Sequence, residues 1–294
     1  MLNNQLLLIF PPPLRGRIKE GGSFWEKHVK GRVLIVAGSD SGGGAGIQAD
    51  IKAVTALEGF AMTAITALTA QNTQGVFGIH EVPASFVAEQ MKVVLGDLGA
   101  DCIKIGMLHS SEIIRVVCDT LSQEAPEVPV VVDPVMVAKG GASLLADDAM
   151  DALKSLMVPR AAILTPNIPE AEALAGLKAP RIEEAEDLAR ALSTMGPQAV
   201  LLKGGHRQGD EVMDLLMERG NVTDIYSSPR INTRHTHGTG CTLASAIATG
   251  IAQGLSLRES VARARNYVVE AIRSAPGFGK GHGPLNHAHT VDEF

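Results

Sequence analysis

Short apolar runs rich in β-branched residues alternate along this chain with longer stretches of helical periodicity. The runs predict buried strands at residues 32–37, 62–68, 102–105, 128–132, 161–164 and 199–202. Apolar residues spaced three or four apart predict intervening helices at residues 47–57, 86–98, 147–157 and 182–195. Such alternation is typical of βαβ units, so we expect a three-layer α/β fold with a mostly parallel central sheet and helices on both faces.

The chain of 294 residues is long enough for one large domain of this kind. Two further helices are expected near its end, at residues 239–253 and from Ser256, where Ser256 and Glu259 have capping-box spacing. Residues 31–294 contain no repeat or linker. Residues 1–30 differ, because a short apolar run precedes prolines and basic residues, the reverse of a signal peptide. We interpret residues 1–30 as a disordered extension and 31–294 as a single domain.

Composition excludes several classes of function. The net charge is −6, which gives no electrostatic basis for binding nucleic acid or a membrane surface. No apolar run approaches the roughly 18 to 20 residues that a membrane span needs. Three widely spaced cysteines form no CxxC pair, which argues against a disulfide framework or a structural zinc site. The default location is therefore the reducing cytoplasm.

The first candidate site is a glycine-rich segment, Gly38–Gly46, directly after the first strand. Ligands of open α/β sheets bind beyond the carboxyl ends of the strands, which is where this segment falls. Glycines allow the backbone to approach a ligand closely. The segment lacks the Gly-Lys-Ser/Thr of a Walker A loop and the register of a dinucleotide fingerprint. It is either a substrate or phosphate loop or a flexible turn.

Polar residues follow the later strands in the same way. Gln71 could bind the edge of a heterocycle or cap a turn, and Asp133 could face a metal or phosphate or start a turn before Pro134. Asn167 and Glu170 could hold Mg²⁺ or form a capping pair at a helix start. Residues 203–205, Lys-Gly-Gly, could bind nucleotide phosphate or form a tight turn.

The most informative segment is Thr236–Ala244, where two glycines and hydroxyl residues open an apolar helix. Unpaired amide groups and the helix dipole make such a start an anion site, suited to the charge of a transferring phosphoryl group. The same dipole should favour the thiolate of Cys241, which could then act as a base. A lone cysteine at a helix start is more often an inert apolar residue.

The order of these segments is more specific than any one of them. They are Ala37–Asp40 with Gly43–Asp50, Ala70–Thr73, Lys104–Leu108, Asp133–Met136, Thr165–Ala171, Lys203–His206 and His237–Cys241. Over about residues 32–289 the chain resembles the hydroxymethylpyrimidine/phosphomethylpyrimidine kinases of thiamine biosynthesis, within the ribokinase-like superfamily. The resemblance implies a ribokinase-like fold. It also implies ATP-dependent phosphorylation of 4-amino-5-hydroxymethyl-2-methylpyrimidine and of its monophosphate, which yields the diphosphate.

The resemblance also implies roles for individual residues. Cys241 is the expected base, where the wider superfamily has an aspartate, and Gly238, Thr239 and Gly240 complete the catalytic anion hole. The substrate-binding residues are Gln71, which meets the aminopyrimidine, with Gly38, Ala45, Asp50, Met107 and Val135. The nucleotide-binding residues are Thr165, Asn167, Lys203, Gly204 and Gly205. Mg²⁺ is expected at Asp133, Asn167 and Glu170.

The expected ligands are therefore ATP, Mg²⁺ and a small pyrimidine, with no nucleic acid or membrane partner, and we expect a cytoplasmic homodimer. A pyridoxal- or pyridoxine-type kinase is the nearest alternative, since both rings are flat and carry a hydroxymethyl group. A silent ligand-binding regulator would be expected to lack Cys241, Lys203 or the pair Asn167 and Glu170, yet all are present. A thiol enzyme would need a histidine–acid partner for Cys241, and none is placed by the sequence.

Overall fold

The computed structural model describes residues 30–138, 141, 143–146, 148–178, 184–205 and 209–291. Apart from Lys30, the extension predicted over residues 1–30 lies outside the described residues. The strands are β1 (Arg32–Asp40), β2 (Phe60–Asn72), β3 (Gly75–Glu81), β4 (Cys102–Ile105), β5 (Val130–Val132), β6 (Ile163–Leu164), β7 (Ala199–Leu202), β8 (Glu211–Glu218) and β9 (Asn221–Pro229). The α-helices are α1 (Gly46–Ala56), α2 (Ala84–Asp97), α3 (Ser111–Glu124), α4 (Ala149–Ala152), α5 (Ile168–Ala175), α6 (Ala185–Ser193), α7 (Thr239–Ala252) and α8 (Leu257–Arg273).

The strands form one sheet in the order β3-β2-β1-β4-β5-β6-β7-β8-β9. Neighbours from β2 to β7 run parallel, whereas β3, β8 and β9 pair antiparallel at the two edges. The predicted α/β fold with a mostly parallel sheet is therefore confirmed. Parallel strands place their carboxyl ends on one side of the sheet, so the residues that follow β1, β4, β5, β6 and β7 are brought together there.

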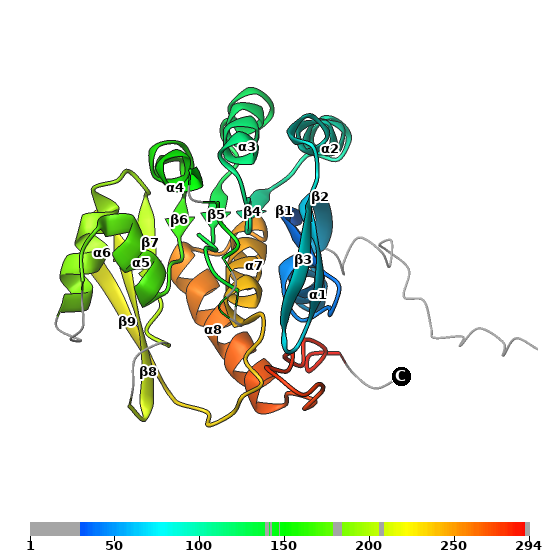
Figure 1. Cartoon of the computed structure of the whole chain (residues 1–294). Coiled ribbons are helices and arrows are strands. Elements are labelled where there is room, and N and C mark those ends of the chain that lie inside the picture. The colour runs from blue at the N-terminus through cyan, green and yellow to red at the C-terminus, as the bar shows by residue number, and fades with distance from the viewer. Residues whose placement is uncertain are drawn as a thin grey trace, which may run out of the picture.

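Helices cover both faces of the sheet (Figure 1). Helices α2 to α6 pack on one face, and α1, α7 and α8 pack on the other. Strand β1 shows how one strand serves both cores, because Leu34 and Val36 contact the first group of helices while Val33 and Ile35 contact the second. Burial on both faces explains the near-continuous apolar runs that predicted the parallel strands.

The sequence pattern did not predict three of the strands, β3, β8 and β9. Every second residue of β9 is exposed, so its apolar content is too low to stand out. Predicted helix positions agree with α1, α2, α6, α7 and α8 to within a few residues, whereas the helix expected at 147–157 is the short α4 followed by a π-helical turn, Leu153–Met157. The capping box at Ser256 and Glu259 is present.

Within the described ranges, no helix has the length and apolar character needed to cross a membrane.

Candidate active site

One cavity of about 830 Å³ lies at the carboxyl ends of the parallel strands. Loops that follow β1, β4, β5, β6 and β7 contribute to its wall, together with the start of α7. Most of the residues expected at the site line it, namely Gly38, Ala45, Gln71, Met107, Asp133, Val135, Asn167, Glu170, Lys203, Gly205, Gly238, Thr239, Gly240 and Cys241. Asp50, Thr165 and Gly204 do not line it.

The first turn of α7 forms the middle of the wall. Gly238 is its N-cap in a left-handed conformation, with φ of 82°, and no side chain caps the first amides. The Thr239 hydroxyl does not cap the helix either, since it donates to the carbonyl oxygen of Thr236 at 2.8 Å. The Thr239 amide also donates to that carbonyl oxygen, at 3.4 Å, so the anion site that the glycine-rich helix start predicted depends on the amides of Gly240 and Cys241.

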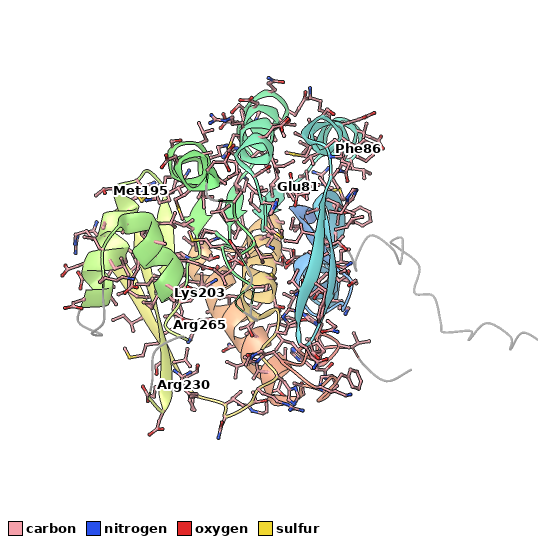
Figure 2. All side chains as sticks on the ribbon, in the orientation of Figure 1. Glu81, Phe86, Met195, Lys203, Arg230 and Arg265 are labelled. Carbon is pink, nitrogen blue, oxygen red and sulfur yellow. The ribbon has the colours of Figure 1, made fainter. Side chains whose placement is uncertain are left out.

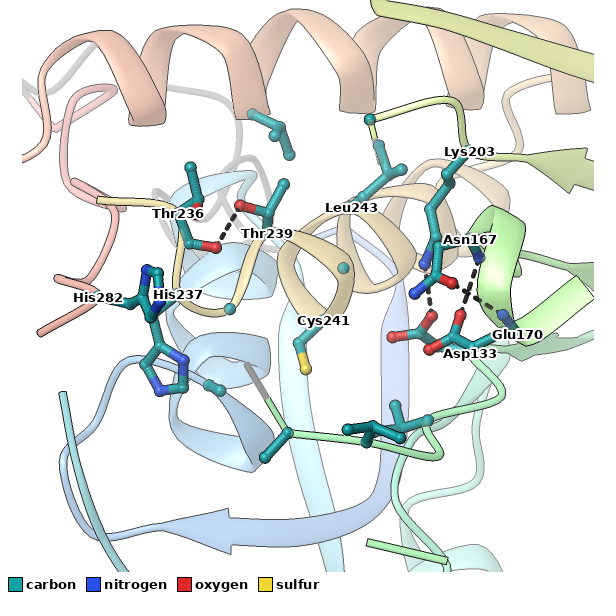
Figure 3. A pocket seen from close by; sticks show the side chains of 18 of the residues that line it. Asp133, Asn167, Glu170, Lys203, Thr236, His237, Thr239, Cys241, Leu243 and His282 are labelled. Atoms are coloured by element: carbon teal, nitrogen blue, oxygen red, sulfur yellow. Dashed lines mark hydrogen bonds and ion pairs between the residues drawn. The ribbon is translucent and has the colours of Figure 1, made fainter. Parts of the chain in front are cut away.

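Cys241 lies between two groups of polar residues, with His237 on one side and Asp133 with Lys203 on the other (Figure 3). Burial raises the pKa of the Cys241 thiol to about 12, although the charge of Lys104 opposes the rise. The expectation that the helix dipole makes this cysteine a thiolate is therefore wrong for the protein without ligands. Desolvation is the largest influence on this thiol, and it keeps the thiol protonated at neutral pH.

Lys104 is a cavity residue that the sequence reasoning missed. It sits in β4 with no exposed surface, and its Nζ lies 2.8 Å from Oδ2 of Asp50. Asp50 is equally buried, and its Oδ1 accepts a hydrogen bond of 2.7 Å from the hydroxyl of Ser245. Burial lowers the pKa of Lys104, but the nearby negative charges, that of Asp50 first, raise it, so the pKa lies above its usual value. Asp50 lies behind Lys104 and neutralises its buried charge. It does not lie at the cavity surface, where the substrate-binding role expected for it would place it.

The second polar group joins β5 to β7. Oδ1 of Asp133 lies 2.8 Å from Nζ of Lys203, and both side chains are largely buried. Burial alone would lower the pKa of Lys203, but the carboxylates of Asp133 and Glu170 hold it above its usual value. Thr165 supports the pair from behind, with its hydroxyl 3.3 Å from the same Oδ1. A lysine that stays charged at the cavity wall suits the binding of phosphate.

Asn167 and Glu170 form the capping box that the sequence left as an alternative. The Asn167 side chain accepts from the Glu170 amide at 2.9 Å, and Glu170 Oε2 accepts from the Asn167 amide at 2.8 Å. Both also line the cavity, beside Asp133 and Lys203 (Figure 3). Burial is the main cause that raises the pKa of Glu170 to about 7, against the opposing charge of Lys203.

The donors near Lys203 fit a magnesium ion that is held mostly by nucleotide phosphates. Mg²⁺ usually takes one or two protein carboxylates and keeps several waters, and the cavity offers the carboxylates of Asp133 and Glu170. Across the part of the chain that the structure describes, no group of three or more histidine, cysteine, aspartate or glutamate side chains could enclose a metal. A site completed by ATP and water is therefore the arrangement these residues can support.

The far end of the cavity is rich in arginine. Arg230 and Arg265 line it near β8, on the same side of the molecule as Lys203 (Figure 2). Nε of Arg265 lies 2.8 Å from Oδ2 of Asp214, whose Oδ1 accepts from the Gly204 amide at 2.8 Å. Gly204 therefore anchors the loop while Gly205 faces the cavity. Neither arginine follows a predicted strand, so the sequence pattern gave no signal for them.

The opposite end is built for a flat group. Gly38, Ala45, Met107 and Val135 line it beside Gln71, which lies in β2 and not in the loop expected after it. His237 and Asp40 complete this wall, and Nε2 of His237 lies 2.9 Å from Oδ2 of Asp40. This contact joins residues far apart in the chain, so no local sequence pattern connects them.

A family model described as phosphomethylpyrimidine kinase matches residues 40–286. The chain is 52% identical over 264 residues to the thiamine biosynthesis bifunctional protein ThiED of Geobacter sulfurreducens, covering 90% of this chain and 54% of that protein, so it spans about half the length of that relative. It is 46% identical over 257 residues to the hydroxymethylpyrimidine/phosphomethylpyrimidine kinase of Bacillus subtilis, covering 87% of this chain and 94% of that one.

Among solved structures, the pyridoxal kinase from Staphylococcus aureus in complex with AMP-PCP and pyridoxal superposes with a TM-score of 0.80 at 31% identity, covering 89% of this chain and 95% of that chain. This likeness supports the ribokinase-like expectation for the fold. Because the family match spans most of the described domain and the Bacillus relative is matched almost end to end, the chain belongs to the phosphomethylpyrimidine kinase family.

Proposed function

We propose that this protein uses ATP to phosphorylate 4-amino-5-hydroxymethyl-2-methylpyrimidine, and then its monophosphate to the diphosphate, in thiamine biosynthesis. The observation that carries the proposal is the layout of the 830 Å³ cavity in a member of this family. The cavity is lined by the flat-ring wall around Gln71, by the uncapped start of α7 and by the charged pair of Lys203 and Asp133. In Figure 3, Cys241 at the start of α7 lies between His237 and that charged pair.

The pyrimidine occupies the Gln71 end of the cavity. Its ring packs against Met107, Val135 and Ala45, with Gly38 leaving room for close approach of the ring. The amide of Gln71 pairs with the polar edge of the ring. The hydroxymethyl group then points toward Cys241 and the start of α7.

ATP lies on the Lys203 side, with its terminal phosphate at the first turn of α7. Lys203 and the amides of Gly240 and Cys241 stabilise the charge on the transferring phosphoryl group, which is the main way in which such reactions are catalysed. Cys241 orients the hydroxymethyl oxygen in the first reaction, or takes its proton once ligand binding has removed the proton of the thiol. In the second reaction the nucleophile is an anionic phosphate oxygen, so the thiol has less to do.

We propose that Asp133 and Glu170 hold Mg²⁺, directly or through water, with Asn167 beside them. When bound, the ion would neutralise phosphate charge that Lys203 alone leaves uncompensated. Thr165 acts only by supporting Asp133, and Gly204 by anchoring the loop that carries Gly205.

Pyridoxal is the second candidate substrate, because a pyridoxal kinase superposes closely on this chain. The identities of 46% and 52% to thiamine-pathway relatives favour the pyrimidine. A thiol enzyme is disfavoured, since it would need a histidine–acid pair beside Cys241. The pair in this cavity is His237 with Asp40, and His237 contacts the Gln71 side chain at 3.4 Å and not Cys241.

We also propose that residues 31–294 act as one kinase domain and that the protein is a cytoplasmic homodimer. Light scattering of the purified full chain tests the assembly state. A mass that corresponds to one chain would exclude the dimer.

Product analysis by ³¹P NMR tests the proposed function. With excess ATP·Mg²⁺, the hydroxymethylpyrimidine should give a phosphomonoester signal that is replaced by a diphosphate pair. Lys203→Met should remove both, since it deletes the charge at the cavity wall while it leaves Asp133 in place. Absence of any phosphorylated pyrimidine with the unaltered protein would refute the proposal.

A further inference from the structure

A buried ion pair beside the cavity has no part in the phosphoryl transfer proposed above. Lys104 and Asp50 have no exposed surface, and 2.8 Å separates Nζ of Lys104 from Oδ2 of Asp50. Taking two charges out of water is costly, and a well-packed apolar pair is often at least as stable. A purely structural role would therefore not require these two charges.

Helix α7 brings Cys241 to this pair. The Ser245 hydroxyl donates to Oδ1 of Asp50 at 2.7 Å, so this face of the helix is turned toward the ion pair. Cys241 precedes Ser245 by four residues, and side chains at that spacing lie on one face of a helix. The Cys241 thiol therefore lies on the same side of α7 as Asp50, one turn closer to the start of the helix.

Lys104 extends toward the same place. A Cβ atom on Gly106 would lie 2.8 Å from Nζ of Lys104, so the ammonium group reaches the residue that directly follows β4. Lys104 and Cys241 both line the cavity. Burial is the main influence on the pKa of the Cys241 thiol, and the charge of Lys104 is the largest influence that lowers it. The ammonium and the sulfur are therefore close enough to interact strongly.

The Lys104 ammonium has protons left for a second acceptor. It carries three protons, and within the described ranges the hydrogen bond of its Nζ goes to Asp50 alone. A thiolate beside this group would accept a charge-assisted hydrogen bond. The Gly46 amide at the start of α1 supplies another donor to the same sulfur. The surroundings of Cys241 thus contain the donors that its anion needs.

We propose that Lys104 is the cationic partner of Cys241 and stabilises its thiolate for the phosphorylation of the hydroxymethyl group, an inference that rests on the proposed function. The thiolate takes the hydroxyl proton while the oxygen bonds to the γ-phosphorus and the bond to ADP breaks. The thiol later gives that proton to water, and Lys104 stays protonated throughout. Because Lys104 has no exposed surface, it is a positioning residue that acts through Cys241 and does not touch the substrate.

Asp50 determines how much of the Lys104 charge acts on the thiol. After burial, the carboxylates of Asp50 and Asp133 are the groups that raise the pKa of Cys241. Removing the Asp50 charge leaves the ammonium without its counter-ion, so a Cys241 thiolate becomes the favoured counter-ion. Removing Lys104 takes away the charge that favours the thiolate. The two changes should move the reactivity of Cys241 in opposite directions, which a general loss of packing would not do.

Alkylation by iodoacetamide tests this in the ligand-free full chain, with the rate at each cysteine read by mass spectrometry of peptides. Only the thiolate reacts, and the partly exposed Cys241 is open to a small reagent from the cavity. At pH 8, Asp50→Asn should raise the rate at Cys241 about 10-fold, which corresponds to one unit in the pKa of the thiol. The double variant Asp50→Asn with Lys104→Met differs from it only at residue 104 and leaves no unpaired buried charge. Its rate should fall below that of the unaltered protein.

The remaining cysteines are internal controls. Cys118 lies in α3 on the other face of the sheet, so its rate should be the same in all three proteins. Cys102 is fully buried and should stay unreacted while the fold is intact. The unaltered protein and the double variant decide the question by themselves, because Lys104 influences the thiol more than Asp50 does. Equal rates at Cys241 in these two proteins, or a faster rate in the double variant, would overturn the proposal.

Turnover gives a second readout. The double variant should slow the first phosphorylation at least about 10-fold more than the second, since only the first needs a base. In a Cys241→Ala background the same two substitutions should change the first reaction by less than about 2-fold, because they act through the thiol. Additive losses would overturn the proposal. If no pyrimidine were phosphorylated, the proposed function would fail, while the alkylation rates would still decide whether Lys104 is the partner of Cys241.

Discussion

Two glycines in the first turn of α7 should respond in opposite ways to the same substitution. Gly238 has φ of 82°, and a Cβ atom there would lie 1.8 Å from the carbonyl oxygen of Gly44. Gly240 is in the helix proper, and its Cβ would meet Oδ2 of Asp133 and Nζ of Lys203 at 3.4 Å, an ordinary contact distance. Gly238→Ala therefore tests packing, and Gly240→Ala tests the space reserved for phosphate.

The expected magnitudes follow from these distances. A non-glycine residue in the left-handed region costs roughly 1 to 3 kcal/mol, and the collision with Gly44 adds to it because the backbone must move. Gly238→Ala should thus lower Tm by more than about 5 °C. Gly240→Ala should leave Tm equal or slightly higher, since alanine favours a helix by up to about 1 kcal/mol. Its methyl group displaces phosphate beside Lys203, which should reduce kcat/KM roughly 100-fold.

Thermal unfolding of the ligand-free proteins and ADP release with the pyrimidine substrate measure the two effects. Each variant is the control for the other, since both add one methyl group two residues apart. Wild-type activity in Gly240→Ala would show that phosphate does not bind at this turn. A Tm loss in Gly240→Ala equal to that in Gly238→Ala would refute the packing argument.

Three further outcomes are expected. Cys241→Ala should slow the first phosphorylation at least about 10-fold more than the second, because only a hydroxyl nucleophile has a proton to lose; equal losses in separate assays of the two steps would sink the idea. The pKa of Glu170 is about 7 in the folded protein and about 4.5 in the unfolded chain, so the folded state binds this proton more tightly. The contribution of Glu170 to the free energy of unfolding therefore falls as pH rises from about 4.5 to 7. Glu170→Gln should therefore gain Tm relative to wild type at pH 8 and not at pH 5. Burial lowers the pKa of His287 to about 4, so wild-type Tm should fall between pH 6.5 and 4, and His287→Gln should flatten that fall.

The sequence predicted the fold well where local pattern and burial coincide. Strand β5 is buried throughout, and its run of valines marks it without any long-range information. Strand β9 is paired only on one side and half exposed, so its identity depends on β8, which the local pattern does not reveal. The antiparallel edge was missed for that reason.

For the site, residues at strand ends were predictable and their partners were not. Asp133 and Lys203 each follow a strand, and the parallel sheet brings them within 2.8 Å. Lys104 looked like part of an apolar run, because the Asp50 carboxylate that permits its burial comes from another element. The Cys241 thiolate was predicted from the helix dipole alone, whereas its pKa is set mainly by burial, which comes from tertiary packing.

The most direct test of the account is ADP release measured with three substrates side by side. The hydroxymethylpyrimidine and its monophosphate should each support turnover with kcat/KM at least about 10-fold above that for pyridoxal. The reason is that the Gln71 amide can pair with an amino group and its neighbouring ring nitrogen, and pyridoxal has no such amino group. Turnover with pyridoxal alone, or ADP release that no pyrimidine stimulates, would contradict the account.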